Sequence, residues 1–158
     1  AHAKAGRPAR IIMKMNALED SEMTRLLYRA SMAGVRVDLV VRGICRLRPG
    51  LVGISDRIRV VSVIGRFLEH SRVYYFANGG ASEMFIGSAD LMHRNLDERV
   101  EVLTPVRHPA YRMRLLQLLE MLLADARQGW RLTDQTWSRG ETFKPGTQST
   151  LLARSRVR

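Results

Sequence analysis

A histidine, an arginine and a glycine–serine step each lie at the end of a predicted strand. His70 precedes a strand at residues 71–76, Arg42 follows one at 35–41, and Gly87-Ser88 ends one at 83–88. Ligands of open α/β sheets bind at strand ends. Histidine can accept a phosphoryl group or move a proton near neutral pH. Arginine binds phosphate through a bidentate fork, and a Gly-Ser turn lets backbone and hydroxyl donors approach closely. These residues indicate a phosphate site.

Each of these residues also has a simpler interpretation. A single histidine beside a strand is more often structural or exposed, and a single arginine after a strand is more often a loop residue. Arg72, Ser88, Arg94 and Asn95 are further candidate phosphate ligands around the same predicted strand ends. Asp90 could accept a hydrogen bond from the His70 imidazole and fix its tautomer. The residue types alone therefore leave the phosphate site as one hypothesis.

The elements that must position these residues alternate between strand and helix. A strand at 11–15, a helix capped by Asp20 or Ser21, a stop at Gly34 and a strand at 35–41 form a strand–helix–strand unit, which favours parallel pairing. Further strands are predicted at 58–64, 71–76, 83–88 and 100–103, with a hairpin turn at 78–80 and a helix that begins at Pro109. The pattern predicts an α/β fold with a central mixed sheet flanked by helices.

The periodic pattern fades after about residue 126. Residues 127–158 hold seven basic and two acidic residues, with few apolar positions. We expect one domain at 1–126 and a basic C-terminal tail at 127–158.

The overall charge restricts the class of partner. The chain of 158 residues carries 26 Lys and Arg against 15 Asp and Glu, a net charge of +11, which attracts polyanions. No apolar run approaches the length of a membrane span, and residues 1–10 contain neither a Met nor the apolar core of a signal peptide. Cys45 is a lone cysteine, so no Cys-rich metal site is available and a reducing compartment is expected. We expect a piece of a longer cytoplasmic protein.

Several stretches resemble the C-terminal region of the bacterial polyphosphate kinase family of the first type. The most specific is Gly65-Arg66-Phe67-Leu68-Glu69-His70-Ser71-Arg72. The other matching stretches, in the family's order and spacing, are residues 14–18, 28–31, 41–45, 47–50, 78–80, 87–90 and 94–97. The resemblance covers roughly residues 3–125.

This resemblance implies a fold and an activity. The family transfers the terminal phosphate of ATP to and from inorganic polyphosphate, with Mg²⁺, through a phosphohistidine. Its two C-terminal domains are phospholipase D-like, and each supplies one histidine to a shared site. By this resemblance the chain is the last domain, His70 is the partner histidine, and Arg42 contacts the nucleotide phosphates. The phosphorylated histidine and most Mg²⁺ contacts would lie in preceding domains, within a homo-oligomer that is cytoplasmic or membrane-associated, and the isolated chain would be inactive.

Two other functions are consistent with parts of the sequence. A phospholipase D-like phosphodiesterase or nuclease could pair two copies of His70 in a dimer. The phospholipase D motif has His-x-Lys followed by an Asp, whereas this chain has His70-Ser71-Arg72 and no Asp four residues on. Polyphosphate kinases share this departure from the motif. The charge of +11 would also suit a non-catalytic polyanion-binding module. Arg46 and Leu91-Met92-His93 depart from the family's usual residues.

Overall fold

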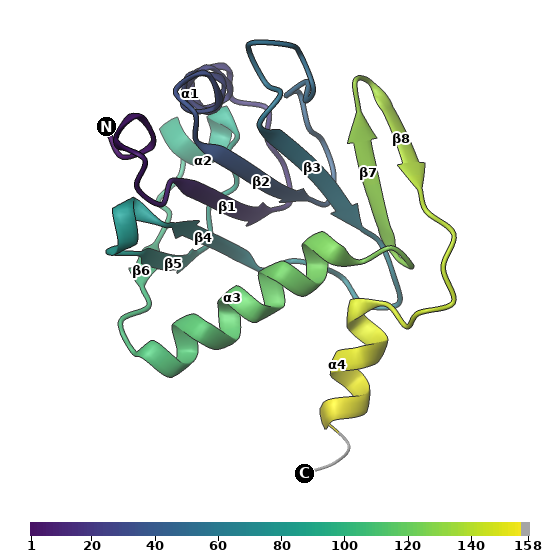
Figure 1. Cartoon of the computed structure of the whole chain (residues 1–158). Coiled ribbons are helices and arrows are strands. Elements are labelled where there is room, and N and C mark those ends of the chain that lie inside the picture. The colour runs from purple at the N-terminus through teal and green to yellow at the C-terminus, as the bar shows by residue number, and fades with distance from the viewer. Residues whose placement is uncertain (156–158) are drawn as a thin grey trace.

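The chain folds around a mixed β-sheet. A computed structural model describes residues 1–155, and within them the strand order is β6-β5-β4-β1-β2-β3-β7-β8 (Figure 1). Strands β1, β2 and β3 are parallel to one another, and every other pairing is antiparallel. The strands span Arg10–Met15 (β1), Arg36–Val41 (β2), Ile58–Val63 (β3), Arg72–Phe76 (β4), Glu83–Gly87 (β5), Leu103–Pro105 (β6), Gly129–Thr133 (β7) and Thr136–Arg139 (β8). The predicted α/β class with a mixed sheet is confirmed.

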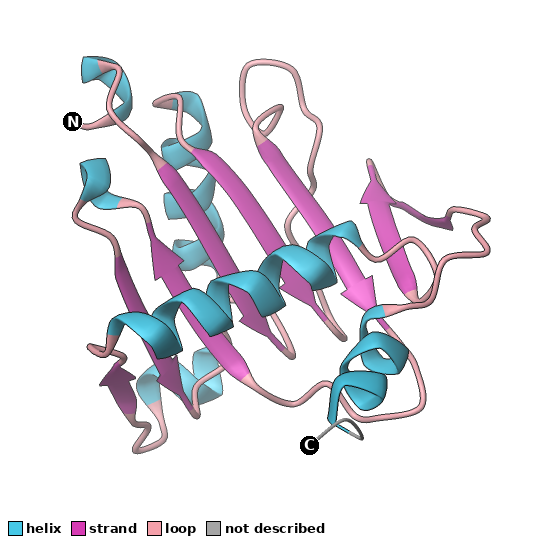
Figure 2. Cartoon of the chain, turned by 60° about the horizontal axis from the view of Figure 1, so that its bottom comes forward, coloured by secondary structure: helices cyan, strands magenta, loops and turns pink. Residues whose placement is uncertain are grey.

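Helices cover both faces of this sheet. In Figure 2 the long helix α3 lies across the front of the sheet and α1 lies behind it. The helices span Ser21–Met32 (α1), His93–Asp97 (α2), Pro109–Ala124 (α3) and Thr147–Ser155 (α4), with short 3-10 turns at Ala3–Ala5 and Asn78–Gly80. Among residues 1–155, none of these helices combines the length and the apolar character that a membrane crossing needs.

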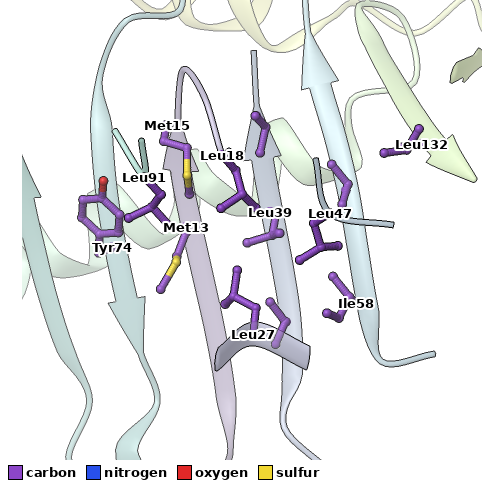
Figure 3. Close-up of a cluster of buried hydrophobic side chains, with 13 residues drawn as sticks. Met13, Met15, Leu18, Leu27, Leu39, Leu47, Ile58, Tyr74, Leu91 and Leu132 are labelled. Atoms are coloured by element: carbon purple, nitrogen blue, oxygen red, sulfur yellow. The ribbon is translucent and has the colours of Figure 1, made fainter. Parts of the chain in front are cut away.

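Alternation along the central strands produces two hydrophobic cores. Met13 and Leu39 point towards the α1 face, where Leu27 of α1 packs against them (Figure 3). Ile12 and Val40 point to the other face, where Leu119, Leu122 and Leu123 of α3 cover them. Because strand side chains alternate, each buried strand contributes to both cores. The sheet is therefore a rigid support for the loops at its edges.

Local signals in the sequence set the ends of α1 and α3. The Asp20 carboxylate accepts a hydrogen bond from the Met23 backbone N–H at 2.7 Å, which caps the first turn of α1. Gly34 follows α1 with φ of 89°, a left-handed conformation that suits glycine. Pro109 is the first residue of α3, where its missing N–H costs nothing. The predicted cap, stop and helix start are confirmed.

The C-terminal region differs from the predicted tail. Strand β7 pairs antiparallel with β3, so that Leu132 lies opposite Val60 and packs into the core on the α1 face. A tight turn with Asp134 in the left-handed region (φ 57°) leads back into β8. The predicted boundary between residues 126 and 127 therefore does not separate two structural units, because the strands on both sides of it belong to one sheet. Of the predicted tail, residues 156–158 lie outside the described residues. The strand predicted at 100–103 likewise forms later, as β6.

Candidate functional site

Strands β2, β4 and β5 bring candidate residues to one edge of the sheet. This edge is formed by strand ends and includes the ends of β1 and β3. The parallel strands β1, β2 and β3 end there, and Asn16 and Arg42 follow directly after β1 and β2. Strand β4 runs antiparallel to β1, so it begins at that edge with Arg72, just after His70. Strand β5 is antiparallel to β4 and ends at the same edge with Gly87, before Ser88. The strand-end placement predicted for Arg42, His70 and Gly87-Ser88 is thus observed.

The buried carboxylate of Asp90 organises this edge. It accepts hydrogen bonds from the Asn16 backbone N–H at 2.6 Å and from the Asn16 side-chain amide at 3.2 Å. The Arg72 guanidinium donates to both carboxylate oxygens, from Nε at 3.2 Å and from Nη2 at 2.9 Å. Burial acts to raise the pKa of Asp90, but the hydrogen bonds from Arg72 and Asn16 outweigh it and hold the pKa below its ordinary value. The carboxylate is therefore ionised at neutral pH.

This network replaces the predicted hydrogen bond between Asp90 and His70. The acceptor positions of Asp90 are taken by Asn16 and Arg72, so it orients an arginine and an asparagine instead of the imidazole. The sequence could not reveal this, because Asn16 lies 74 positions before Asp90 and meets it only across the sheet.

Arg42 is joined to the same network through Asn16. Its Nε donates to the Asn16 side-chain oxygen at 3.1 Å, and its backbone carbonyl accepts from the Ser62 hydroxyl at 3.0 Å. The next residue, Gly43, donates from its N–H to the Asn16 carbonyl at 2.8 Å. A Cβ at Gly43 would come 3.1 Å from that oxygen, so glycine permits the close approach. The Nη groups of Arg42 make no hydrogen bond to residues 1–155 and are free to bind an anion.

His70 has an exposed side chain on the loop that leads into Arg72. Its backbone carbonyl accepts a hydrogen bond from Arg72 Nη1 at 2.7 Å. The following carbonyl, of Ser71, accepts from Lys14 Nζ at 3.1 Å. The imidazole itself makes no hydrogen bond within the described part of the chain, which leaves both ring nitrogens available to a ligand.

Three other candidates lie further along this edge, around Glu101. The Glu101 carboxylate accepts a hydrogen bond from the Asn95 side-chain amide at 2.5 Å and another from the Ser88 hydroxyl. These two donors lower the pKa of Glu101. Arg94, on α2, is exposed and makes no ion pair with the residues described. Ser88, Asn95 and Arg94 thus stand outside the hydrogen bonds that link Arg42, Asn16, Asp90 and Arg72.

Comparison with known proteins decides the family. The sequence profile described as polyphosphate kinase C-terminal domain 2 matches residues 1–150. The chain belongs to this polyphosphate kinase family. The resemblance noted in the sequence is therefore confirmed, and the match extends past residue 125 to include β7, β8 and the start of α4.

Individual relatives agree with this assignment. A polyphosphate kinase of Thermosynechococcus vestitus is 54% identical over 98% of this chain and 22% of its own length. One of Pseudomonas aeruginosa is 50% identical over 96% of this chain and 23% of its own length. The chain thus spans under a quarter of the curated polyphosphate kinases that it matches.

Solved structures place the fold. The crystal structure of polyphosphate kinase from Porphyromonas gingivalis superposes with a TM-score of 0.90 at 37% identity, over 98% of this chain and 24% of that one. The phospholipase D family member Nuc from Salmonella typhimurium superposes with a TM-score of 0.61 at 16% identity, over 84% of this chain and 87% of that one. The predicted phospholipase D-like fold is confirmed.

The polyphosphate kinase domain holds one more charged residue at this edge that the sequence analysis missed. Lys14 of β1 is only 1% exposed, and its ammonium lies 3.3 Å from the Glu69 carboxylate. Burial lowers the pKa of Lys14 against the opposing effect of Glu69, and the charges of Arg72 and Arg42 lower it further. A lysine inside the apolar run Ile11–Met15 was the available signal, because a lysine is almost never fully buried unless it is paired.

The donor set around His70 does not fit a magnesium ion. Mg²⁺ prefers carboxylate and water oxygens, whereas the side chains here are mainly cationic. The carboxylates of Asp90, Glu69 and Glu101 are engaged by arginine, lysine and amide donors. Within residues 1–155 no cluster of three or more His, Cys, Asp or Glu side chains is arranged to hold a metal.

Proposed function

We propose that this domain forms half of a phosphoryl-transfer site that moves the terminal phosphate of ATP to and from inorganic polyphosphate. The observation that carries the proposal is the fixed pair Arg42 and Arg72, both tied to Asp90 at the sheet edge where His70 is exposed. Catalysis of phosphoryl transfer rests on positioning and on fixed charges around the transferring group. An arginine held by a buried carboxylate supplies such charge with little reorganisation.

Each residue has a distinct proposed role. Arg42 offers its free Nη groups to the phosphates of ATP or ADP, as a bidentate ligand. His70 is the partner histidine that donates a hydrogen bond or a proton on the path of the γ-phosphate. Arg72 adds positive charge beside it. Ser88, Arg94 and Asn95 are proposed to contact the polyphosphate chain, and Ser88 and Asn95 would have to leave Glu101 to do so.

The proposal places the rest of the site in other domains. The phosphorylated histidine, most contacts to Mg²⁺ and the oligomer contacts would come from preceding domains of a longer cytoplasmic enzyme. This is supported by the relatives, of which the chain spans under a quarter. The isolated chain is therefore expected to bind the phosphate ligands without turnover.

One alternative has a specific observation in its favour. The fold is shared with Nuc, a phospholipase D family member, and this shared fold is the observation that favours a phosphodiesterase formed by two copies. Against it, the residue two positions after His70 is an arginine that is committed to Asp90. A diester-hydrolysis assay with the isolated chain separates the two functions, because only the phosphodiesterase should turn over without other domains.

The proposal is tested with His70→Ala and Arg42→Ala in a full-length polyphosphate kinase that contains this chain as its C-terminal domain. Polyphosphate synthesis from ATP should fall by at least about 100-fold for His70→Ala, as for removal of a group that acts in proton transfer. Arg42→Ala should raise the KM for ATP. Arg25→Ala, on the exposed surface of α1, is the control and should behave as the unmodified enzyme. Normal synthesis by His70→Ala would contradict the proposal.

A further inference from the structure

The loop that carries His70 has little hydrophobic anchorage. Residues 64–71 join β3 to β4 without helix or strand. Two large apolar side chains in it, Phe67 and Leu68, remain 47% and 69% exposed. Ordering such a segment costs about 1–2 kcal/mol of backbone entropy per residue. Polar contacts must therefore fix its conformation.

Gln148 of α4 supplies the most extensive of these contacts. Its side chain is only 5% exposed and bonds to the Phe67 backbone in both directions. Gln148 Oε1 accepts from the Phe67 N–H at 2.9 Å, and Nε2 donates to the Phe67 carbonyl at 2.8 Å. Nε2 also donates to the Glu69 carboxylate at 2.9 Å. One side chain thus holds the loop at two positions, at Phe67 and at Glu69, the residue before His70.

Other side chains hold the backbone on the far side of His70. Glu69 forms the ion pair with Lys14, and Lys14 also donates to the Ser71 carbonyl. The carbonyl of His70 itself accepts from Arg72. The backbone on both sides of the imidazole is thereby held by side chains of β1, β4 and α4.

Two further features show that the position of Gln148 is itself fixed. The backbone N–H of Thr147 donates to Asp125 at 2.6 Å, and the Thr147 hydroxyl donates to the Met121 carbonyl at 3.0 Å, which ties the start of α4 to the end of α3. Gly65 leaves the space that Gln128 and Gln148 need, since a Cβ there would overlap Gln128 Nε2 and lie 2.5 Å from Gln148 Oε1. Helix α3 packs on the sheet, so this chain of contacts connects the core to the loop.

We propose that Gln148 is a positioning residue for His70. Through Phe67 and Glu69 it holds the 64–71 loop in the conformation that presents the imidazole at the same edge of the sheet as Arg42 and Arg72. The inference rests on the proposed function of His70. It assigns a role in the site to α4, a segment that composition alone had placed in a tail. Because Gln148 lies outside the phosphate-facing groups, its loss should change how well His70 is placed and leave nucleotide binding largely intact.

The test removes the hydrogen bonds of Gln148 and keeps its volume. Gln148→Met is compared with Gln117→Met, which changes an exposed glutamine on α3. In the 158-residue chain, exchange of the Phe67 amide, which donates to Gln148 Oε1, should become at least about tenfold faster in Gln148→Met, with β1 and β2 unchanged. The NMR resonances of the His70 ring should shift or broaden. Gln117→Met should alter neither.

Kinetics in the full-length enzyme complete the test. Gln148→Met should lower kcat by about 10-fold to 100-fold, as expected for a reacting group displaced by about 1 Å, with the KM for ATP within about twofold. Gly65→Ala, whose Cβ would crowd both Gln128 and Gln148, should reproduce both effects and serves in its place if Gln148→Met does not fold. Unchanged exchange in the loop, or a kcat equal to that of Gln117→Met, would overturn the inference.

The outcomes also separate this inference from the proposed function. If Gln148→Met loosens the loop and lowers kcat while His70→Ala is fully active, Gln148 acts through another residue, and both the role of His70 and this positioning role fail. If His70→Ala is inactive while Gln148→Met is normal, the proposed function stands and only the positioning role is lost.

Discussion

Arg42 donates a hydrogen bond from Nε to the side-chain oxygen of Asn16 at 3.1 Å. The amide of Asn16 donates in turn to Asp90, which also binds Arg72. A buried carboxylate thus orients one arginine directly and a second through an asparagine. This arrangement keeps two positive groups close together without requiring each to have its own acid.

Removing the linking amide should free Arg42. In the full-length enzyme, we expect Asn16→Ala to lower kcat/KM for ATP by about 5-fold to 30-fold, the value of one to two kcal/mol of lost orientation. Most of the change should appear in KM, since Arg42 is proposed to contact the nucleotide. Asn78→Gly, in the turn between β4 and β5 at the opposite edge of the sheet, is the control. Equal kinetic constants for the two variants would show that Asn16 does not orient a ligand-binding group.

The stability provided by Asp90 should depend on pH. Its pKa in the folded chain is below the ordinary value of about 3.9, so the folded state binds fewer protons and gains stability above that pH. Asp90→Asn should therefore be less stable at pH 7, by about 1–3 kcal/mol. The difference should shrink as the pH falls from about 5 through the lowered pKa. Urea unfolding of the 158-residue chain at several pH values measures it, and a difference that stays constant down to pH 3 would contradict the assignment.

A second buried aspartate separates stability from function. Asp38 accepts hydrogen bonds from Arg10 at 2.7 Å and from Arg59 at 2.9 Å, and it lies on β2 away from the site. Asp38→Asn should also lower stability, by about 1–3 kcal/mol. At a temperature where both variants remain folded, only Asp90→Asn should reduce polyphosphate synthesis. A similar loss in both would indicate that Asp90 acts on the fold alone.

Sequence reasoning recovered the parts of the fold that local signals encode. The short apolar run Ile11–Met15 corresponds to an observed strand, and the Asp20 cap and Pro109 correspond to observed helix ends. It missed β7 because Leu132 is buried, and Trp130 half-buried, only where β3 offers a pairing partner, which is a long-range property. It missed Lys14 and Gln148 for the same reason. The partner of Lys14, Glu69, lies 55 positions away, and the partner of Gln148, Phe67, lies 81 positions away. The placement of His70 and Arg42 at strand ends could be predicted because each lies next to a stretch with strand character.

The isolated chain should bind polyphosphate through defined residues. A net charge of +11 gives any polyanion some affinity, which falls steeply with salt. If Arg42 and His70 belong to a specific site, Arg42→Ala should weaken polyphosphate binding more than Arg25→Ala at the same total charge. Titration calorimetry at low and moderate salt distinguishes them. If both variants lose the same polyphosphate affinity, and the chain binds DNA as well as it binds polyphosphate, the non-catalytic polyanion-binding module is favoured.

The region after residue 126 should be part of the cooperative fold. Leu132 of β7 is buried against the core on the α1 face, so Leu132→Ala should lower the free energy of unfolding by about 2–4 kcal/mol. Leu68→Ala removes the same atoms from an exposed position and should change it by less than about 0.5 kcal/mol. Urea denaturation followed by circular dichroism measures both. Because β7 pairs along β3, loss of β7 would also uncover Val61 and Val63 and leave β3 as an unpaired edge strand. A Leu132→Ala effect as small as that of Leu68→Ala would mean that β7 is only loosely attached to the rest of the sheet.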